Sequence, residues 1–138
     1  MNAGAALSID DVDIGYGGAP VQSGIRVEIE RGEIFAIVGD SGSGKSTLLK
    51  TMIGLIPPRR GSVRFDGKPL AEYMERGAPP FGVLFQNGAL WTSMTVEENV
   101  MLPMELQRHS TPAERRALAR FKLALVGLAG HEHLSPAS

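Results

Sequence analysis

The sequence contains no cysteine among its 138 residues. Disulfide bonds and thiolate metal sites are therefore excluded as means of stabilising the chain. No apolar run approaches the ~18 residues that a membrane-spanning helix needs. The N-terminal residues lack a basic segment followed by an apolar one, so we expect no signal peptide. We expect a cytosolic protein that reaches a membrane only through a partner.

A large charge of either sign is also missing. The chain has 14 basic and 15 acidic side chains, for a net charge of −1. This balance argues against a broad nucleic-acid footprint, so we expect no nucleic-acid partner. Hydrophobic residues make up 43% of the sequence, which is enough for a core, and the length suits one domain.

What the sequence does contain is a glycine-rich stretch, residues 39–47, that fits the pattern of a phosphate-binding loop. Backbone N–H groups can wrap closely around phosphates only where residues lack a Cβ, and Gly39, Gly42 and Gly44 meet this need. Lys45 adds a positive charge that can reach the terminal phosphates, and the Ser46 hydroxyl suits Mg²⁺. The stretch therefore predicts nucleotide phosphate binding.

The residues on either side of this loop predict a buried strand and a helix. Residues 34–38 form an unbroken apolar run, which is typical of a parallel strand buried on both faces. Residues 45–53 carry apolar side chains at helical spacing and are followed by Gly54. The dipole at the start of that helix favours an anion. A second apolar run, residues 81–85, predicts another core strand.

Alternating patterns predict further strands that are antiparallel. Residues 7–14 predict an edge strand with an irregularity at Asp10-Asp11, and residues 25–30 predict a half-buried strand. Residues 62–65 predict a short strand that ends in a tight turn at Asp66-Gly67.

Two capping boxes, Thr95–Glu98 and Thr111–Glu114, predict two helices near the C-terminus. Pro103 is expected to kink or end the first helix. The second helix is expected to present one apolar face, made of Ala117, Leu118, Phe121, Ala124 and Leu125.

In their order along the chain, these features resemble the ATP-binding subunit of an ABC transporter. Tyr16 stands where that family has an aromatic residue that stacks on adenine, and residues 39–47 match its phosphate loop. Phe85-Gln86 is similar to its Q-loop, and residues 94–100 resemble the start of its helical subdomain.

The resemblance implies an α/β fold: a P-loop NTPase of the ABC ATPase type, with a partial parallel core sheet, an antiparallel β flank and the start of a helical subdomain. Residues 1–138 would be the N-terminal part of one ATP-binding domain. Residues 1–93 would form its core with the antiparallel flank, and residues 94–138 the start of the helical subdomain.

The resemblance also implies ATP and Mg²⁺ as cofactors and ATP hydrolysis coupled to transport. Lys45 and Gln86 are then the expected catalytic residues, and Ser46 and Gln86 the expected Mg²⁺ ligands. The expected nucleotide-binding residues are Tyr16, Gly39, Ser41, Gly42, Ser43, Gly44, Lys45, Ser46 and Thr47.

Two partners follow from the same resemblance. One is a transmembrane permease subunit, contacted through residues 86–94, and the other is a second ATP-binding subunit in a homodimer. The permease would hold the protein on the cytoplasmic side of the inner membrane. The sequence of residues 85–91 is similar to the corresponding segment of the Mla/Mce-type ATPases of bacterial phospholipid trafficking, which implies a lipid cargo.

Several family motifs have no counterpart in these residues: the LSGGQ signature, the second acidic strand, the catalytic glutamate and the switch histidine. We therefore expect the N-terminal portion of a truncated ATPase, inactive alone. A nucleotide-binding fragment without catalysis and another phosphate-loop enzyme, such as a small-molecule kinase, are open alternatives. Trp91, beside Leu90 and Met94, is either a half-buried loop anchor or an exposed docking residue.

Overall fold

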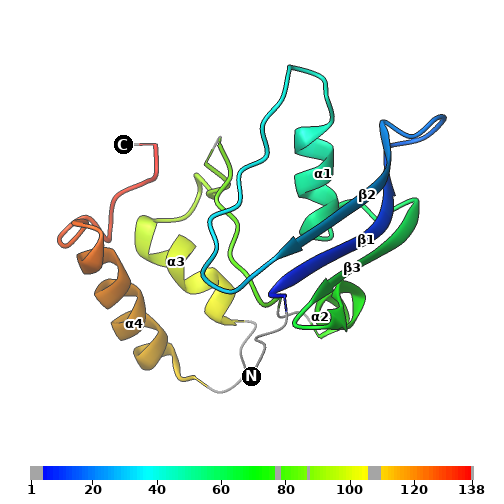
Figure 1. The fold of residues 1–138 in the computed structure, drawn as a ribbon. Helices are drawn as coiled ribbons and strands as arrows, with labels where there is room; N and C mark the ends of the chain where they lie inside the picture. The colour runs from blue at the N-terminus through cyan, green and yellow to red at the C-terminus, as the bar shows by residue number, and fades with distance from the viewer. Residues whose placement is uncertain (1–4, 77–78, 87, 106–109, 138) are drawn as a thin grey trace. The chain divides into compact units, whose positions relative to one another are not determined.

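A computed structural model describes residues 5–76, 79–86, 88–105 and 110–137 (Figure 1). Contacts between residues divide the chain into two compact units, Met1–Gly82 and Val83–Ser138. Asn87, within the stretch that resembles a Q-loop, lies outside the described residues. No helix in the described ranges is long and apolar enough to cross a membrane.

The first unit is built on an antiparallel sheet with the strand order β2-β1-β3-β4. Its strands are β1 (Leu7–Ile14), β2 (Gln22–Ile29), β3 (Arg60–Phe65) and β4 (Lys68–Pro69). Because β1 pairs with both β2 and β3, the prediction of an edge strand at residues 7–14 is wrong. Alternation along a strand reports which face is buried, and it does not report how many neighbours the strand has.

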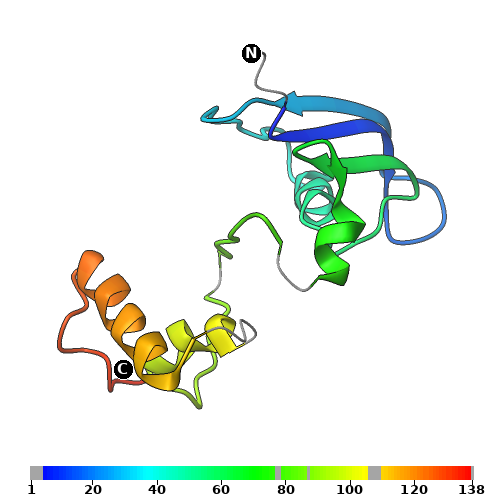
Figure 2. The ribbon, with the colours of Figure 1, turned by 90° about the horizontal axis from the view of Figure 1, so that it is seen from below.

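Helix α1 (Lys45–Met52) packs against one face of this sheet (Figures 1 and 2). The shorter helix α2 (Leu70–Glu75) follows β4 and was not predicted. Apolar side chains from β1, β3 and the two helices form the core of the unit: Leu7, Ile9, Val12, Ile14, Leu48, Met52, Val63 and Leu70. The predicted helix over residues 45–53 and the predicted turn at Asp66-Gly67 are both confirmed.

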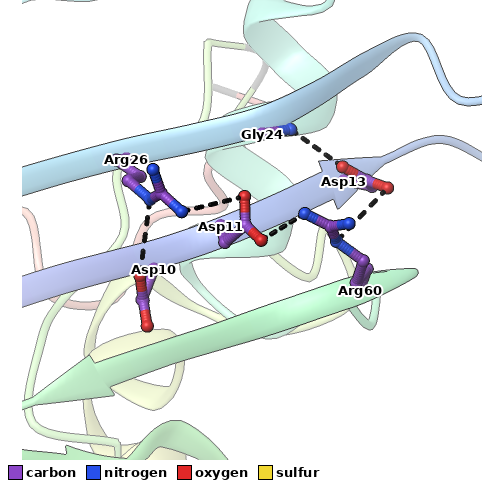
Figure 3. Close-up of polar contacts among 6 residues, drawn as sticks. All are labelled: Asp10, Asp11, Asp13, Gly24, Arg26 and Arg60. Carbon is purple, nitrogen blue, oxygen red and sulfur yellow. Dashed lines mark hydrogen bonds and ion pairs between the residues drawn. The ribbon is translucent and has the colours of Figure 1, made fainter.

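The predicted irregularity in the first strand is a β-bulge at Asp10-Asp11. The extra residue, Asp11, has a φ of 51°, and it returns Val12 to the buried face after Ile9. Arg26 of β2 lies 3.7 Å from Asp10 and 3.4 Å from Asp11 (Figure 3). Arg60 of β3 forms an ion pair with Asp11 as well, so the bulge is tied to both neighbouring strands.

The two predicted core strands, residues 34–38 and 81–85, do not form, and these predictions are wrong. Ile34 is 97% exposed and Leu84 is 98% exposed. A central parallel strand needs a hydrogen-bonded neighbour at each edge, and the described part of the chain pairs neither run with another strand. Phe81 packs on the first unit's core instead, with its ring centroid 4.8 Å from that of Phe65.

The second unit consists of helices α3 (Val96–Glu105) and α4 (Pro112–Leu125) with their flanking loops. Both predicted capping boxes are confirmed. The N–H of Thr95 donates to Glu98 Oε2 at 2.7 Å, and the N–H of Glu98 donates to Thr95 Oγ1 at 3.2 Å. The same reciprocal pair joins Thr111 and Glu114. Helix α3 continues past Pro103 to Glu105, so the proline does not end it.

The apolar face predicted for the second helix is not the face that packs within this unit. Ala119 and Leu123 are the buried residues of α4, whereas Phe121 is 60% exposed and Leu125 is 69% exposed. Helix α4 meets α3 along a narrow seam, and Glu97 of α3 fixes it through ion pairs with Arg116 and Arg120.

Candidate functional site

The glycine-rich stretch forms a loop that leads directly into α1. Gly44 occupies the N-cap position with a left-handed φ of 98°. A Cβ at this position would lie 2.9 Å from Val21 Cγ1, because the turn between β1 and β2 packs directly against the loop. Both the dihedral and the close approach therefore require glycine here. At Gly39, a Cβ would come within 3.1 Å of Ser43 Oγ.

The start of α1 has free backbone donors. Gly44 supplies no capping side chain, and the first turn of α1 contains no acidic residue. The contrast is α4, where the Thr111 side chain accepts a hydrogen bond from the backbone of Glu114. The first-turn N–H groups of α1 lack such a side-chain acceptor, and the helix dipole adds positive potential there. This arrangement suits an anion such as a phosphate.

Lys45 folds back over the loop that precedes it. Its ammonium donates to the carbonyl oxygens of Gly39 at 2.7 Å and Asp40 at 2.6 Å. Ser43 Oγ lies 3.5 Å from the same nitrogen. The two carbonyl groups thus hold the positive charge of Lys45 at the rim of the loop, and its predicted contact with terminal phosphates remains a prediction.

The loop hydroxyls differ in their exposure. Ser41 and Ser46 are exposed, so their hydroxyls are open to a ligand, and Ser43 is half-buried. Thr47 is only 8% exposed and lies on the buried side of α1, where its carbonyl accepts a hydrogen bond from Thr51 at 3.0 Å. Ser46, in the first turn of α1, is therefore better placed than Thr47 to offer an oxygen to a metal ion.

Tyr16 lies on the turn between β1 and β2, which is closed by a 2.8 Å hydrogen bond from the Val21 N–H to the Ile14 carbonyl. Tyr16 is 69% exposed. Lys50 Nζ of α1 lies 3.4 Å from the Tyr16 hydroxyl and 6.0 Å from the ring centroid. Tyr16 is thus beside the helix that begins at the loop, and Lys50 is a neighbour that the sequence analysis missed.

In the second unit, Gln86 is exposed, and its predicted role at a metal ion remains a prediction. The loop that follows is anchored by Asn99 of α3. The Trp91 N–H donates to Asn99 Oδ1 at 2.8 Å, and Asn99 Nδ2 donates to the Trp91 carbonyl at 2.9 Å. The Trp91 side chain is 62% exposed. Within this unit the backbone of Trp91, and not its side chain, anchors the loop. This favours the interpretation of the Trp91 indole as an exposed docking residue over that of a half-buried loop anchor.

Comparison with known proteins adds an independent line of evidence. A family model described as "ABC transporter" matches residues 22–136. The chain is 35% identical over 140 residues to the probable ribonucleotide transport ATP-binding protein mkl of Mycobacterium leprae, covering 99% of this chain and 40% of that protein. The methionine import ATP-binding protein MetN of Mesorhizobium japonicum is 39% identical over 127 residues, covering 89% of this chain and 34% of MetN.

A third relative is the intermembrane phospholipid transport system ATP-binding protein MlaF of Haemophilus influenzae, at 31% identity over 134 residues. That match covers 94% of this chain and 51% of MlaF. The chain thus spans between about a third and a half of these relatives.

Solved structures agree with this family match. The structure of an ATP-binding subunit of an ABC transporter matches with a TM-score of 0.80 and 30% identity, covering 96% of this chain and 55% of that one. A dimeric ATP-binding cassette in a post-hydrolysis state with ADP and Pi also has a TM-score of 0.80, at 26% identity, covering 95% of this chain and 62% of that one. The expected fold class, a P-loop NTPase of the ABC ATPase type, is confirmed.

Proposed function

The chain belongs to the ABC transporter family, and from this premise we propose that it binds ATP as part of an ATP-binding subunit that powers transport. The observation that carries the proposal is the loop of residues 39–44, which ends at the uncapped N-terminus of α1 with the Lys45 ammonium at its rim. The family match favours this function over a small-molecule kinase, the alternative left open above.

The groups around the loop have separate proposed tasks. The first-turn N–H groups of α1 bind the β-phosphate, and Lys45 exchanges its two carbonyl partners for the oxygens of the terminal phosphates. The exposed Ser46 hydroxyl would be a ligand for Mg²⁺. When bound, Mg²⁺ neutralises charge that develops on the phosphates during transfer. The exposed ring of Tyr16 stacks on the adenine.

The partners are proposed by the same route. The exposed Trp91 and Leu90, on the loop that Asn99 anchors, are suited to contact an apolar surface of a permease. For Gln86, just before this loop, we keep as a proposal the expected role of a Mg²⁺ ligand. A second ATP-binding subunit is the other partner, in line with the dimeric solved structure of similar fold. This assembly would hold the protein peripherally at the inner membrane.

For the cargo we propose a phospholipid. The relative from Haemophilus influenzae is described as serving intermembrane phospholipid transport, and the sequence of residues 85–91 supports the same class of cargo. Other relatives are described as serving ribonucleotide and methionine transport, so the cargo needs its own test. Copurification of a permease that moves phospholipid between vesicles in the presence of ATP supports the proposal, and a permease that moves only methionine or ribonucleotides contradicts it.

Nucleotide binding itself is tested by calorimetry of the 138-residue chain with MgATP. Lys45→Ala removes the charge that faces the terminal phosphates, and we expect it to weaken MgATP binding at least tenfold. Lys68→Ala is the matched control, because it removes an equal charge from an exposed position in β4. Equal affinities for MgATP in the unaltered chain and in Lys45→Ala would defeat the proposal.

A further inference from the structure

The first residue of β2 contacts the phosphate loop. Gln22 opposes Ile14 at the end of the β1–β2 ladder, beside the turn that carries Tyr16. Its Nε2 lies 2.6 Å from the carbonyl oxygen of Ser43. A carbonyl oxygen only accepts hydrogen bonds, so the amide must present its NH₂ group to the loop. Nothing in the local sequence pattern pointed to this contact, because the two residues are 21 positions apart.

The carbonyl that Gln22 holds belongs to the same peptide unit as the N–H of Gly44. A trans peptide is planar, so its C=O and N–H point in opposite directions. Fixing the Ser43 carbonyl toward β2 therefore fixes the Gly44 N–H away from β2. A hydrogen bond accepted by the carbonyl also polarises the peptide, which makes its N–H a stronger donor.

Gly44 lies close to the end of the β1–β2 hairpin, where Gln22 itself is exposed. A Cβ on Gly44 would lie 2.9 Å from Val21 Cγ1, 3.6 Å from Ile14 Cδ1 and 3.8 Å from Gln22 Cδ. The end of the β1–β2 hairpin thus lies against the peptide that joins Ser43 to Gly44. The contact has two independent parts, an apolar one through Val21 and Ile14 and a polar one through Gln22.

We propose that Gln22 is a positioning residue of the phosphate loop, and that its amide holds the Ser43–Gly44 peptide so that the Gly44 N–H is presented to the β-phosphate of a bound nucleotide. The inference rests on the proposed nucleotide-binding function. It assigns to β2 a part in binding that acts through the loop backbone and needs no contact between Gln22 and the nucleotide.

The test compares binding of trinitrophenyl-ADP and trinitrophenyl-AMP to the full 138-residue chain, followed by fluorescence. Gln22→Met keeps the length of the side chain and removes its donor. Gln22→Glu keeps the shape and replaces the donor with a carboxylate that repels the Ser43 carbonyl. The control is Glu28→Met, an exposed position further along the same strand.

We expect the Kd for the ADP probe to rise about fivefold in Gln22→Met, which corresponds to one net hydrogen bond, and further in Gln22→Glu. The Kd for the AMP probe, which lacks a β-phosphate, should change less than twofold. The amide ¹⁵N resonance of Gly44 should shift in both Gln22 variants without nucleotide, and it should not shift in Glu28→Met. Circular dichroism shows whether each variant is folded.

The outcomes separate the two proposals. If the unaltered chain binds neither probe, the proposed function fails and this inference fails with it. If the unaltered chain binds both probes and Gln22→Met binds the ADP probe equally well, only the role of Gln22 is overturned. Equal weakening for both probes would also overturn it, because a general loss of structure does not distinguish the β-phosphate. An unshifted Gly44 resonance in a folded Gln22→Met has the same consequence.

Discussion

At the phosphate loop, the important side chains act on backbone groups. Gly44 leaves the start of α1 uncapped, so the helix N–H groups remain available to a ligand. The Lys45 ammonium holds two loop carbonyls, and Gln22 holds a third. A polar backbone group that is already oriented costs less to bring to a ligand than a mobile one. We therefore expect these contacts to lower the cost of ordering the loop around a phosphate.

Tyr16 is the residue at which an adenine contact is most directly tested. Tyr16→Ala should weaken ATP binding by about 1–3 kcal/mol, the usual value of a base–aromatic stack. Tyr16→Phe removes the hydroxyl beside Lys50 and keeps the ring, so it should bind ATP almost normally. Tyr16→Trp should also retain binding. Competition with a fluorescent nucleotide measures ATP binding by all three variants. A loss of binding in Tyr16→Phe or Tyr16→Trp as large as that in Tyr16→Ala would argue against stacking.

Gly61 supports the bulge in β1 by having no side chain. Its φ is 80°, and a Cβ there would lie 2.4 Å from the carbonyl oxygens of both Asp10 and Asp11. Gly61→Ala should therefore lower the free energy of unfolding by more than ~2 kcal/mol, because backbone must move.

Gly67→Ala is the matched control for this effect. Gly67 has a similar φ of 74°, and a Cβ there would meet nothing within 4 Å. Its replacement should cost about 1 kcal/mol for the dihedral alone. Urea denaturation gives both values, and equal losses of stability in the two variants would show that the contact with the bulge is unimportant.

Among the elements, those coded by neighbouring residues were predicted correctly. Each capping box needs only four consecutive residues, such as Thr95 to Glu98, and the turn at Asp66-Gly67 needs two. The strand predicted at residues 34–38 needed partners that the described chain does not provide, so its apolar composition alone did not produce a strand. The same limit applies to the site, because the pairs Gln22–Ser43 and Tyr16–Lys50 join distant positions without a distinctive local pattern.

The helices of the second unit should lose stability in acid. Hydrogen bonds from Thr95 lower the pKa of the Glu98 carboxyl below its usual 4.5, and those from Thr111 lower the pKa of Glu114 in the same way. A carboxyl whose pKa is lower in the folded state contributes stability above its unfolded pKa, and that contribution is lost as the pH falls through the folded pKa. The thermal midpoint, followed by circular dichroism, should therefore drop as the pH falls below about 4.5.

The double variant Glu98→Gln/Glu114→Gln tests the cause of this drop. Glutamine can accept the same hydrogen bonds and does not titrate, so the variant should show a smaller fall of the midpoint between pH 6 and pH 3. Glu75→Gln removes one carboxyl outside both capping boxes and should behave like the unaltered chain. An unchanged pH dependence in the double variant would mean that other carboxyls govern the acid response.

At the scale of the whole molecule, two apolar runs, residues 34–38 and 83–85, are largely exposed to solvent. Ile34 and Val38 are 97% and 86% exposed, and Leu84 is 98% exposed. We propose that in a complete ATP-binding cassette further strands cover these residues, and that runs 34–38 and 83–85 then join a parallel sheet. Exposed β-branched runs are prone to associate, so we expect the 138-residue chain to be poorly soluble.

The 138-residue chain supplies only part of what ATP hydrolysis needs. Phosphoryl transfer to water needs a held γ-phosphate, a held metal ion and a positioned water. Lys45 and Ser46 suit the first task and part of the second, and the sequence offers no clear candidate for the base that positions water. The 138-residue chain should therefore bind MgATP without releasing phosphate over many turnovers.

The assay is phosphate release by the purified chain, with Lys45→Ala as the control for contaminating ATPases. Multiple turnovers that disappear in Lys45→Ala would contradict this prediction and would place the missing base within Met1–Ser138.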